Sequence, residues 1–241
     1  MRITEKLAKK QKDKYSNAPV TIAFIGDSVT QGCFECYRTH SGGFDTVYDP
    51  NFAYSQRVRE ILNLLYPSAQ INVVNGGLSG DNATEGIKRF NRDVAAYKPD
   101  LVVISYGLND SVRGIGNIQN YLSAVGTLID DAQAIGAEVI FLTQNRMCDK
   151  ISKTLTDATL VSVAEETMPT QNGNVLKEYF DKVTDLCKQK GVAVCDTYSK
   201  WEAMFNGGVD TTELLANKIN HPIREMHYYI AIKLVETMFT K

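Results

Sequence analysis

Several residue types and patterns are scarce in this chain, and each absence narrows what the protein can do. The 241 residues include one tryptophan and three histidines, and the formal net charge is only -2. No apolar run approaches the roughly 20 residues that span a bilayer. The chain has no excess of positive charge, so its composition does not indicate binding to nucleic acid or to an anionic membrane surface. What remains, with 44% hydrophobic residues, is the composition of an ordinary globular domain.

The amino-terminal segment and the cysteine count bear on the cellular compartment. Met1–Ala18 is rich in lysine and has no apolar run, so it lacks the pattern of a secretory signal peptide. Five cysteines are an odd number, which argues for a reducing compartment rather than for a set of paired disulfides. From the chain as given, we expect a cytoplasmic protein.

Two of the cysteines, Cys33 and Cys36, form a Cys-x-x-Cys pair. A zinc site would need a second such pair, or two histidines at ligand spacing, and the sequence has neither. Redox chemistry would need the pair at a helix start after a strand, whereas this pair is expected in a Gly-rich loop. We therefore expect ordinary loop cysteines. The remaining three cysteines are expected to act as small core hydrophobes: Cys148, Cys187 and Cys195.

Apolar runs alternate with amphipathic segments along almost the whole chain. The runs predict strands at 20–25, 70–75, 100–106, 137–143 and 191–196, and the amphipathic segments predict helices at 52–65, 81–97, 117–135, 173–190 and 223–239. Such strict alternation is typical of a parallel sheet covered by helices on both faces. We expect one domain over residues 18–241, preceded by a helix or arm at 1–17. The long stretches 31–51 and 144–172 follow strands, so both should overhang the carboxyl edge of the sheet.

Polar blocks follow three of these strands and precede the last helix. Gly26-Asp27-Ser28 comes directly after the first apolar run, which predicts a strand that ends in a sharp turn and displays a hydroxyl. The carboxyl ends of strands are where open α/β sheets bind ligands. A serine there can act as a nucleophile if a base and an oxyanion cradle converge on it. The remaining blocks offer such groups: Gly76-Gly77-Leu78-Ser79-Gly80-Asp81, Gly107-Leu108-Asn109-Asp110 and Asn220-His221-Pro222.

The order of these blocks resembles the SGNH (GDSL-type) hydrolase family of esterases and lipases, over about residues 20–240. The resemblance implies a serine nucleophile at Ser28 and a general base at His221. It implies an oxyanion hole made by the Ser28 N–H, the Gly80 N–H and the Asn109 side-chain amide. It also implies the fold of that family, a three-layer α/β/α arrangement with a five-stranded parallel sheet in flavodoxin-like strand order.

One position departs from the family pattern. An aspartate usually lies three residues before the histidine, and this chain has Lys218 there. The nearby polar side chains are Asn217 and Asn220. An asparagine oxygen or a backbone carbonyl would fix the tautomer of the imidazole without stabilising its charge as a carboxylate does. We expect this uncharged orientation. The alternative is a carboxylate from another segment, with three candidates: Asp196, Asp210 and Glu213.

Each of these residues also has a simpler structural interpretation. Ser28 would then only close a turn, and His221 would only start the last helix. Asp110 is expected to bond backbone amides nearby, and Gly76 or Gly77 competes with Gly80 for the oxyanion role. The two remaining histidines have weaker claims, since His40 lies in a long loop and His227 is expected to be a packed or solvent-facing residue of the last helix.

The expected activity is hydrolysis of small-molecule carboxylic esters through an acyl-enzyme on Ser28, with no metal or organic cofactor. Short acyl groups, such as acetyl esters on carbohydrates, are favoured because no exposed apolar run indicates a lid for lipid aggregates. A lysophospholipase or thioesterase is the alternative of the same class. Two interpretations from different classes are a non-catalytic sugar-binding protein and a nucleotide- or flavin-binding protein, although the chain lacks Gly-x-Gly-x-x-Gly after its first strand. Nucleic-acid partners are not expected, and the sequence indicates no oligomeric state.

Overall fold

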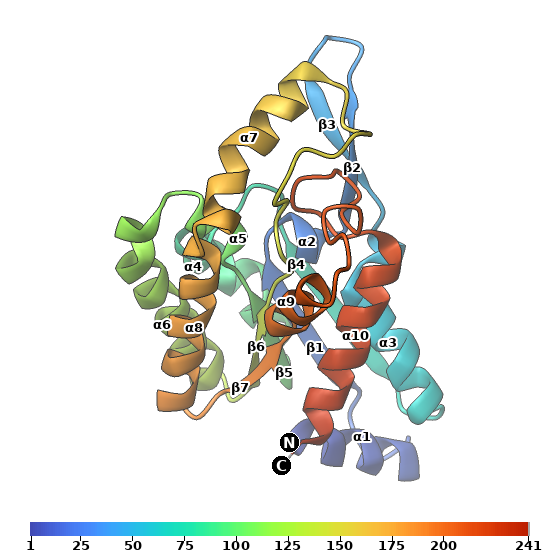
Figure 1. Cartoon of the computed structure of the whole chain (residues 1–241). Coiled ribbons are helices and arrows are strands. Elements are labelled where there is room, and N and C mark those ends of the chain that lie inside the picture. The colour runs from blue at the N-terminus through green and yellow to red at the C-terminus, as the bar shows by residue number, and fades with distance from the viewer. Residues whose placement is uncertain (241) are drawn as a thin grey trace.

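The predicted strands form one parallel sheet in the middle of the molecule (Figure 1). The computed structural model describes residues 1–240. The sheet has the spatial order β4-β1-β5-β6-β7 and consists of β1 (Val20–Gly26), β4 (Ile71–Gly77), β5 (Leu101–Ser105), β6 (Glu138–Thr143) and β7 (Ala193–Asp196). Numbered among themselves, these strands run 2-1-3-4-5, which is the flavodoxin-like order. The predicted five-stranded, three-layer α/β fold is confirmed.

Helices connect the strands and cover the sheet. Within residues 1–240 the α-helices are α1 (Arg2–Lys12), α2 (Ser28–Gln31), α3 (Tyr54–Leu65), α4 (Ala83–Asp93), α5 (Leu108–Ser111), α6 (Ile118–Ala134), α7 (Ala158–Asn172), α8 (Val175–Gln189), α9 (Tyr198–Asn206) and α10 (Arg224–Phe239). Short 3-10 helices are η1 (Pro50–Phe52), η2 (Ala95–Tyr97) and η3 (Ile115–Asn117). Helices α4, α6 and α8 pack together on one face of the sheet, and α3 packs against α10 on the opposite face (Figure 1).

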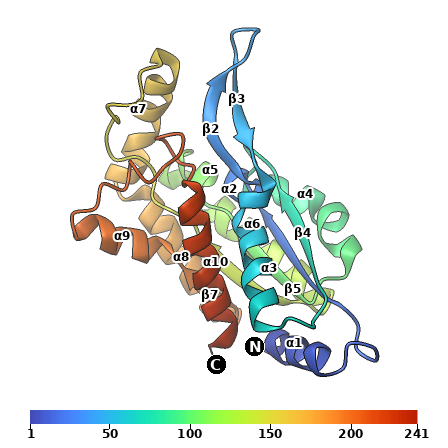
Figure 2. The same ribbon diagram turned by 90° about the vertical axis from the view of Figure 1, so that its right-hand side faces the viewer.

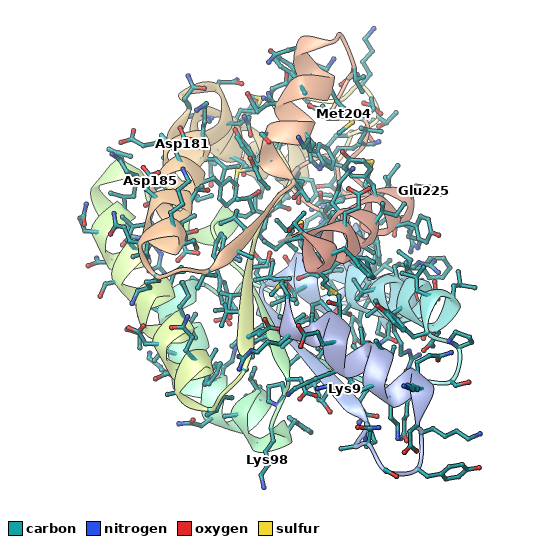
Figure 3. All side chains as sticks on the ribbon, turned by 90° about the horizontal axis from the view of Figure 1, so that it is seen from below. Lys9, Lys98, Asp181, Asp185, Met204 and Glu225 are labelled. Carbon is teal, nitrogen blue, oxygen red and sulfur yellow. The ribbon has the colours of Figure 1, made fainter. Side chains whose placement is uncertain are left out.

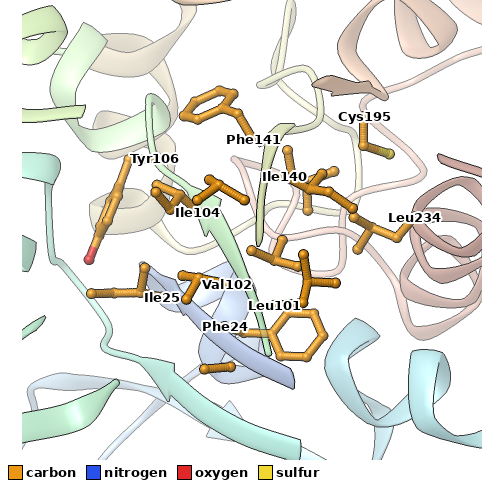
Figure 4. Close-up of a cluster of buried hydrophobic side chains, with 14 of the residues drawn as sticks. Phe24, Ile25, Leu101, Val102, Ile104, Tyr106, Ile140, Phe141, Cys195 and Leu234 are labelled. Carbon is orange, nitrogen blue, oxygen red and sulfur yellow. The ribbon is translucent and has the colours of Figure 1, made fainter. Parts of the chain in front are cut away.

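The central strands are buried on both faces. Every residue of β5 is buried, as its continuous apolar run predicts for a strand covered by two layers of helices. Figure 4 shows side chains of β1, β5 and β6 meeting in one cluster with Leu234 of α10. Burying each large apolar side chain contributes about 1.5–3 kcal/mol. This core makes the sheet a rigid base for the loops at its carboxyl edge.

Both long stretches contain secondary structure that the sequence did not predict. Residues 31–51 include an antiparallel hairpin of β2 (Cys33–Arg38) and β3 (Phe44–Tyr48), which rises beyond the carboxyl edge of the sheet (Figure 2). Residues 144–172 include α7, whose apolar residues do not gather on one face. Helix α9 lies outside these two stretches and was not predicted either. Arg38 and Asp157 join the hairpin to the start of α7 by an ion pair of 2.7 Å.

Helix α1 lies across the amino-terminal end of the sheet. Ile3 and Leu7 are fully buried in the main core, and the carboxylate of Glu138 accepts hydrogen bonds from the backbone N–H groups of Arg2 and Ile3 at 2.8 and 2.6 Å. Figure 3 views the molecule from this end and shows the exposed Lys98 at its rim. Across residues 1–240, no helix combines the length and apolar character needed to cross a membrane.

Candidate active site

Ser28 lies where the first strand turns into a short helix. Strand β1 ends at Gly26, and Asp27 is the N-cap of α2, with its carboxylate accepting a hydrogen bond from the Val29 N–H at 3.0 Å. Ser28 is the first residue of α2, where backbone N–H groups have no acceptor within the helix. The hydroxyl therefore lies at the carboxyl edge of the sheet, beside N–H donors that the helix itself does not use.

The side chain of His221 meets this hydroxyl. Its Nε2 lies 2.9 Å from Ser28 Oγ, and its Nδ1 lies 3.0 Å from the carbonyl oxygen of Phe34. A carbonyl oxygen only accepts, so Nδ1 carries the proton and Nε2 is the acceptor. Burial lowers the pKa of His221 below its ordinary value of 6.5. The ring is therefore a neutral base, held in the tautomer that can take a proton from Ser28.

The group that orients His221 is a backbone carbonyl rather than a carboxylate. Within residues 1–240 the hydrogen bonds of the ring nitrogens go to Ser28 and Phe34. The carboxylates considered from the sequence have different partners: Asp196 accepts from Thr143 and Ser199, Asp210 pairs with Lys150, and Glu213 pairs with Lys218. The hairpin strand β2 thus supplies, through its main chain, the contact that an acid makes in a Ser-His-Asp site.

Asn217 and Asn220 do not orient the ring directly, which corrects that expectation. The Oδ1 of Asn217 accepts hydrogen bonds from the backbone N–H groups of Ile219, Asn220 and His221 at 3.0, 2.9 and 2.9 Å. Its Nδ2 donates to Asn220 Oδ1 at 2.9 Å. The two side chains bond to each other inside the loop, and the hydrogen bonds of the imidazole go to Phe34 and Ser28 instead. Asn217 instead fixes the backbone from which His221 projects.

Lys218, at the usual position of the acid, faces away from the histidine ring. Its backbone has φ 59°, in the left-handed region that most side chains avoid. Its Nζ donates to the carbonyl oxygen of Glu213 and lies 3.0 Å from the Glu213 carboxylate.

A small second core holds the loop that carries His221. Trp201 is fully buried in it, and the other members of this cluster are Cys148, Ala164, Leu215, Ile219 and Met226. The Cys148 N–H donates to the Ile219 carbonyl at 2.8 Å, and Asn145 Nδ2 donates to the Asn220 carbonyl at 2.8 Å. The segment after β6 therefore holds the loop before α10 that carries His221, since this loop does not follow directly on a strand of the sheet.

Gly80 and Asn109 follow the strands on either side of β1. Gly26 pairs with Gly77 of β4 and with Ser105 of β5, so both loops begin beside the Ser28 turn. Asn109 Nδ2 donates to the Asp81 carbonyl oxygen at 2.8 Å, which ties the two loops together, and the amide carries a second N–H. Gly80 has φ 78°, which glycine adopts at little cost. Ser28, Gly80 and Asn109 thus lie on adjoining segments at one edge of the sheet, and His221 meets this edge through its contact with Ser28.

Residues that the sequence did not assign to the site hold these loops. The buried Arg89 of α4 donates to the carbonyl oxygens of Gly26, at 2.9 Å, and Gly76, and its Nε lies 2.7 Å from Asp81. An arginine inside a helix gives no local sign of such a role. Asp81 is a plausible N-cap of this helix by sequence, but Asn82 caps α4 instead.

Asp110 has the structural role expected for it. Its Oδ1 accepts a hydrogen bond from the Ala83 N–H at 3.1 Å, which links the Asn109 loop to the start of α4. Burial raises the pKa of Asp110 to about 6.

The remaining two histidines lie away from the reacting pair. His40 is exposed in the turn of the β2–β3 hairpin. His227 is fully buried, and its Nδ1 accepts a hydrogen bond from the Tyr54 N–H at 3.1 Å. Burial lowers the pKa of His227 to about 3, so this ring stays neutral and packs against Phe34, with the ring centroids 4.8 Å apart.

Cys33 and Cys36 lie on strand β2, which corrects the expectation of a loop. All five cysteines, each among the described residues, are free thiols. Burial raises the pKa of Cys33 to about 11 and also raises that of Cys36. Because the thiolate is the reactive form, neither side chain has the character of a redox cysteine. Cys148, Cys187 and Cys195 are buried.

The fold and the Ser28–His221 pair define an α/β protein with a serine displayed at the carboxyl edge of its sheet. The sequence matches the GDSL-like Lipase/Acylhydrolase family over residues 24–228, and the chain belongs to that family. It is 37% identical over 92 residues to the acetylxylan esterase of Geobacillus stearothermophilus and 36% identical over 81 residues to the arylesterase of Vibrio mimicus. These matches cover 38% and 33% of this chain, and the chain spans about two-fifths of the length of these curated relatives, 40% and 39%.

Solved structures share the fold over nearly the whole chain. An acetylxylan esterase from Geobacillus stearothermophilus superposes with a TM-score of 0.66 at 21% identity, covering 93% of this chain and 97% of that one. The lipase/acylhydrolase from Enterococcus faecalis gives a TM-score of 0.65 at 20% identity, covering 91% and 95%. The implied SGNH-type architecture is therefore confirmed.

Proposed function

We propose that this protein is a serine esterase that hydrolyses carboxylic esters through an acyl-enzyme on Ser28. The observation that carries the proposal is the 2.9 Å contact between Ser28 Oγ and Nε2 of a buried, neutral His221. A serine that only closed a turn would not need an imidazole acceptor whose tautomer is fixed by the Phe34 carbonyl. Membership of the GDSL-like family supports the same activity.

The proposed reaction has two matched halves. Ser28 Oγ attacks the ester carbonyl carbon while His221 Nε2 takes the hydroxyl proton. The Gly80 N–H, the Ser28 N–H and the Asn109 amide then stabilise the charge on the former carbonyl oxygen. The bond to the alcohol breaks, and the alcohol oxygen takes the proton from His221. Water repeats the sequence on the acyl-enzyme, which releases the acid and restores Ser28.

Acetyl esters on carbohydrates are the substrate class we favour. One relative by sequence carries a name of that kind, the acetylxylan esterase of Geobacillus stearothermophilus. A solved structure of similar fold does so too, a two-domain esterase described as active on acetylated mannans, of which this chain covers 52%. Two further relatives are named arylesterase and Esterase TesA, and these names do not refer to carbohydrate esters. A lysophospholipase or thioesterase remains the alternative of the same class.

A fluorophosphonate probe and a series of p-nitrophenyl esters test this proposal. The probe should label Ser28 alone, as read by peptide mass, because its hydroxyl has a base in contact. Hydrolysis should be fastest for acetate and should fall as the acyl chain lengthens. A panel of acetylated and deacetylated xylo- and manno-oligosaccharides, read by acetate release, then tests the carbohydrate preference.

Two results would count against the proposal. A protein that binds acetylated sugars but neither reacts with the probe nor releases acetate would be the non-catalytic sugar-binding member. A yellow chromophore retained through purification would favour the flavin-binding alternative. Turnover that rises with chain length would keep the esterase but replace the acetyl preference.

The pH dependence of hydrolysis should report a base without a carboxylate partner. Only neutral His221 can accept the proton, so kcat/KM should rise with pH through the histidine's ionisation and then reach a plateau. Burial lowers the pKa of His221, and within residues 1–240 no ion pair raises it, so the midpoint of the histidine's ionisation should lie at or below about 6.5. The exposed His40 provides the matched control, and His40→Gln should leave the profile unchanged. A midpoint clearly above 7 would contradict the Phe34 orientation.

A further inference from the structure

One buried glutamine joins the nucleophile turn to the oxyanion loop. Gln144 follows β6 at the carboxyl edge of the sheet and is 2% exposed. Its Nε2 donates to both carboxylate oxygens of Asp27, at 3.0 and 2.8 Å. Its Oε1 accepts the Leu108 N–H at 3.0 Å. Asp27 immediately precedes Ser28, and Leu108 immediately precedes Asn109, so one side chain bridges the two segments.

The chemistry of this bridge admits few residue types. While it is ionised, Asp27 offers only acceptors to Gln144, and its carboxylate also takes the Val29 N–H at 3.0 Å. Leu108 offers only a donor. The bridging side chain must therefore donate at one end and accept at the opposite end, which a glutamine does and a carboxylate or a hydrocarbon does not. All three partners are at most 2% exposed, so water is a poor substitute for a lost contact.

We infer that Gln144 is a positioning residue of the active site, which sets the Asn109 amide relative to Ser28 Oγ so that both meet the same ester carbonyl. The inference rests on the proposed function. Oxyanion stabilisation depends on donors already placed where charge develops, and a shift of about 1 Å can cost about 100-fold in rate. The hydrogen bonds of the Gln144 side chain go to Asp27 and Leu108 rather than to Ser28 Oγ or the Asn109 side chain, so it would act through those two residues.

Further charged groups surround the bridge. Burial raises the pKa of Asp27 to about 7, against the lowering effect of the Gln144 and Val29 hydrogen bonds, and the carboxylates of Asp110 and Asp81 add to the rise. The guanidinium of Arg89 reaches the Gly26 carbonyl and pairs with Asp81. A second carboxyl group placed beside Asp27 would therefore retain a proton to high pH.

Gln144→Glu gives the most specific test, because it keeps the shape and adds one titratable group. While the two carboxyl groups share one proton, the introduced carboxyl group can donate its O–H to Asp27 and accept the Leu108 N–H on its second oxygen. When that proton leaves at higher pH, two carboxylates face each other and the bridge opens. We expect an alkaline limb in kcat, with a fall of about 10- to 100-fold and a smaller change in KM, where the wild type has a plateau.

The charge-exchanged pair tests the same bridge by rescue. Asp27→Asn alone puts an NH2 group against the Gln144 NH2 group, and turning Gln144 over only moves the conflict to the Leu108 N–H. In the double variant Asp27→Asn/Gln144→Glu, the amide at position 27 accepts the Val29 N–H on its oxygen and donates its NH2 group to the carboxylate at position 144. The second oxygen of that carboxylate accepts the Leu108 N–H. The double variant should recover kcat by about 10-fold over Asp27→Asn and should lack the alkaline limb.

Gln171→Glu is the matched control. Gln171 is 3% exposed and also bridges, accepting the Met147 N–H and donating to Tyr198 Oη, each at 3.0 Å. It should lower the melting temperature without an alkaline limb in kcat. Two outcomes would overturn this inference while leaving the proposed function intact. One is an active wild type whose Gln144→Glu variant keeps the plateau in kcat. The second is a double variant that is folded by circular dichroism but shows no recovery of kcat. A wild type inert to esters and to the probe would remove the proposed function, and the inference with it.

Discussion

Ser28→Ala should abolish ester hydrolysis while leaving the fold almost intact. The variant removes the atom that forms the acyl-enzyme, and loss of a serine nucleophile costs about six orders of magnitude where it has been measured in another serine hydrolase. The hydroxyl lies 2.9 Å from His221 Nε2, and Ser28 is 5% exposed. One lost hydrogen bond of about 1 kcal/mol corresponds to a shift of only about 2–4 °C in the melting temperature of a domain of this size.

The assay compares acetate release, fluorophosphonate labelling and thermal melting in the same preparations. Ser152→Ala serves as the matched control, since Ser152 is also buried and its hydroxyl donates to the Glu213 carboxylate at 2.5 Å. That variant should keep both turnover and labelling. Substantial turnover in Ser28→Ala would assign the nucleophile to another residue.

Asn109→Ala should lower kcat by about 100- to 1,000-fold with a smaller change in KM. Its amide donor acts mainly on the charge that develops in the transition state, and deletion of one such donor typically costs that much. The variant also loses the 2.8 Å bond to the Asp81 carbonyl, which ties the Gly80 loop to the Asn109 loop. Asn109→Asp should be slower still, because a carboxylate would face both the developing oxyanion and the Asp81 carbonyl.

Asn172→Ala separates this effect from the loss of any asparagine bond. Asn172 Nδ2 donates to the Asp149 carbonyl at 3.0 Å, the same kind of contact outside the site. We expect unchanged kcat there. An Asn109→Ala variant that changed KM alone would show that the amide binds the substrate without stabilising the transition state.

Much of the architecture follows from local patterns in the sequence. The β-branched run before Gly26-Asp27-Ser28 becomes β1, and the later apolar runs become the remaining strands of the sheet. Alternation of strands and helices then leaves a parallel sheet as the arrangement that covers both faces. The order of the polar blocks places Ser28, Gly80 and Asn109 at one edge, because parallel strands share their carboxyl ends. These features could be predicted because each depends on residues close together in the chain.

The contacts that tune the site were decided by the tertiary structure. Phe34 and His221 are 187 positions apart, and the atom that meets the ring is a main-chain oxygen, which every residue has. Asn217 is polar and close to His221 in the chain, but its amide has its partners within its own loop. Gln144 and Arg89 gave no local signal, since their partners lie in segments far away in the chain that only the assembled sheet brings together. Periodicity determines which elements form, whereas long-range packing determines which polar atoms meet. In this protein that packing places the Phe34 carbonyl oxygen, rather than a carboxylate, beside His221 Nδ1.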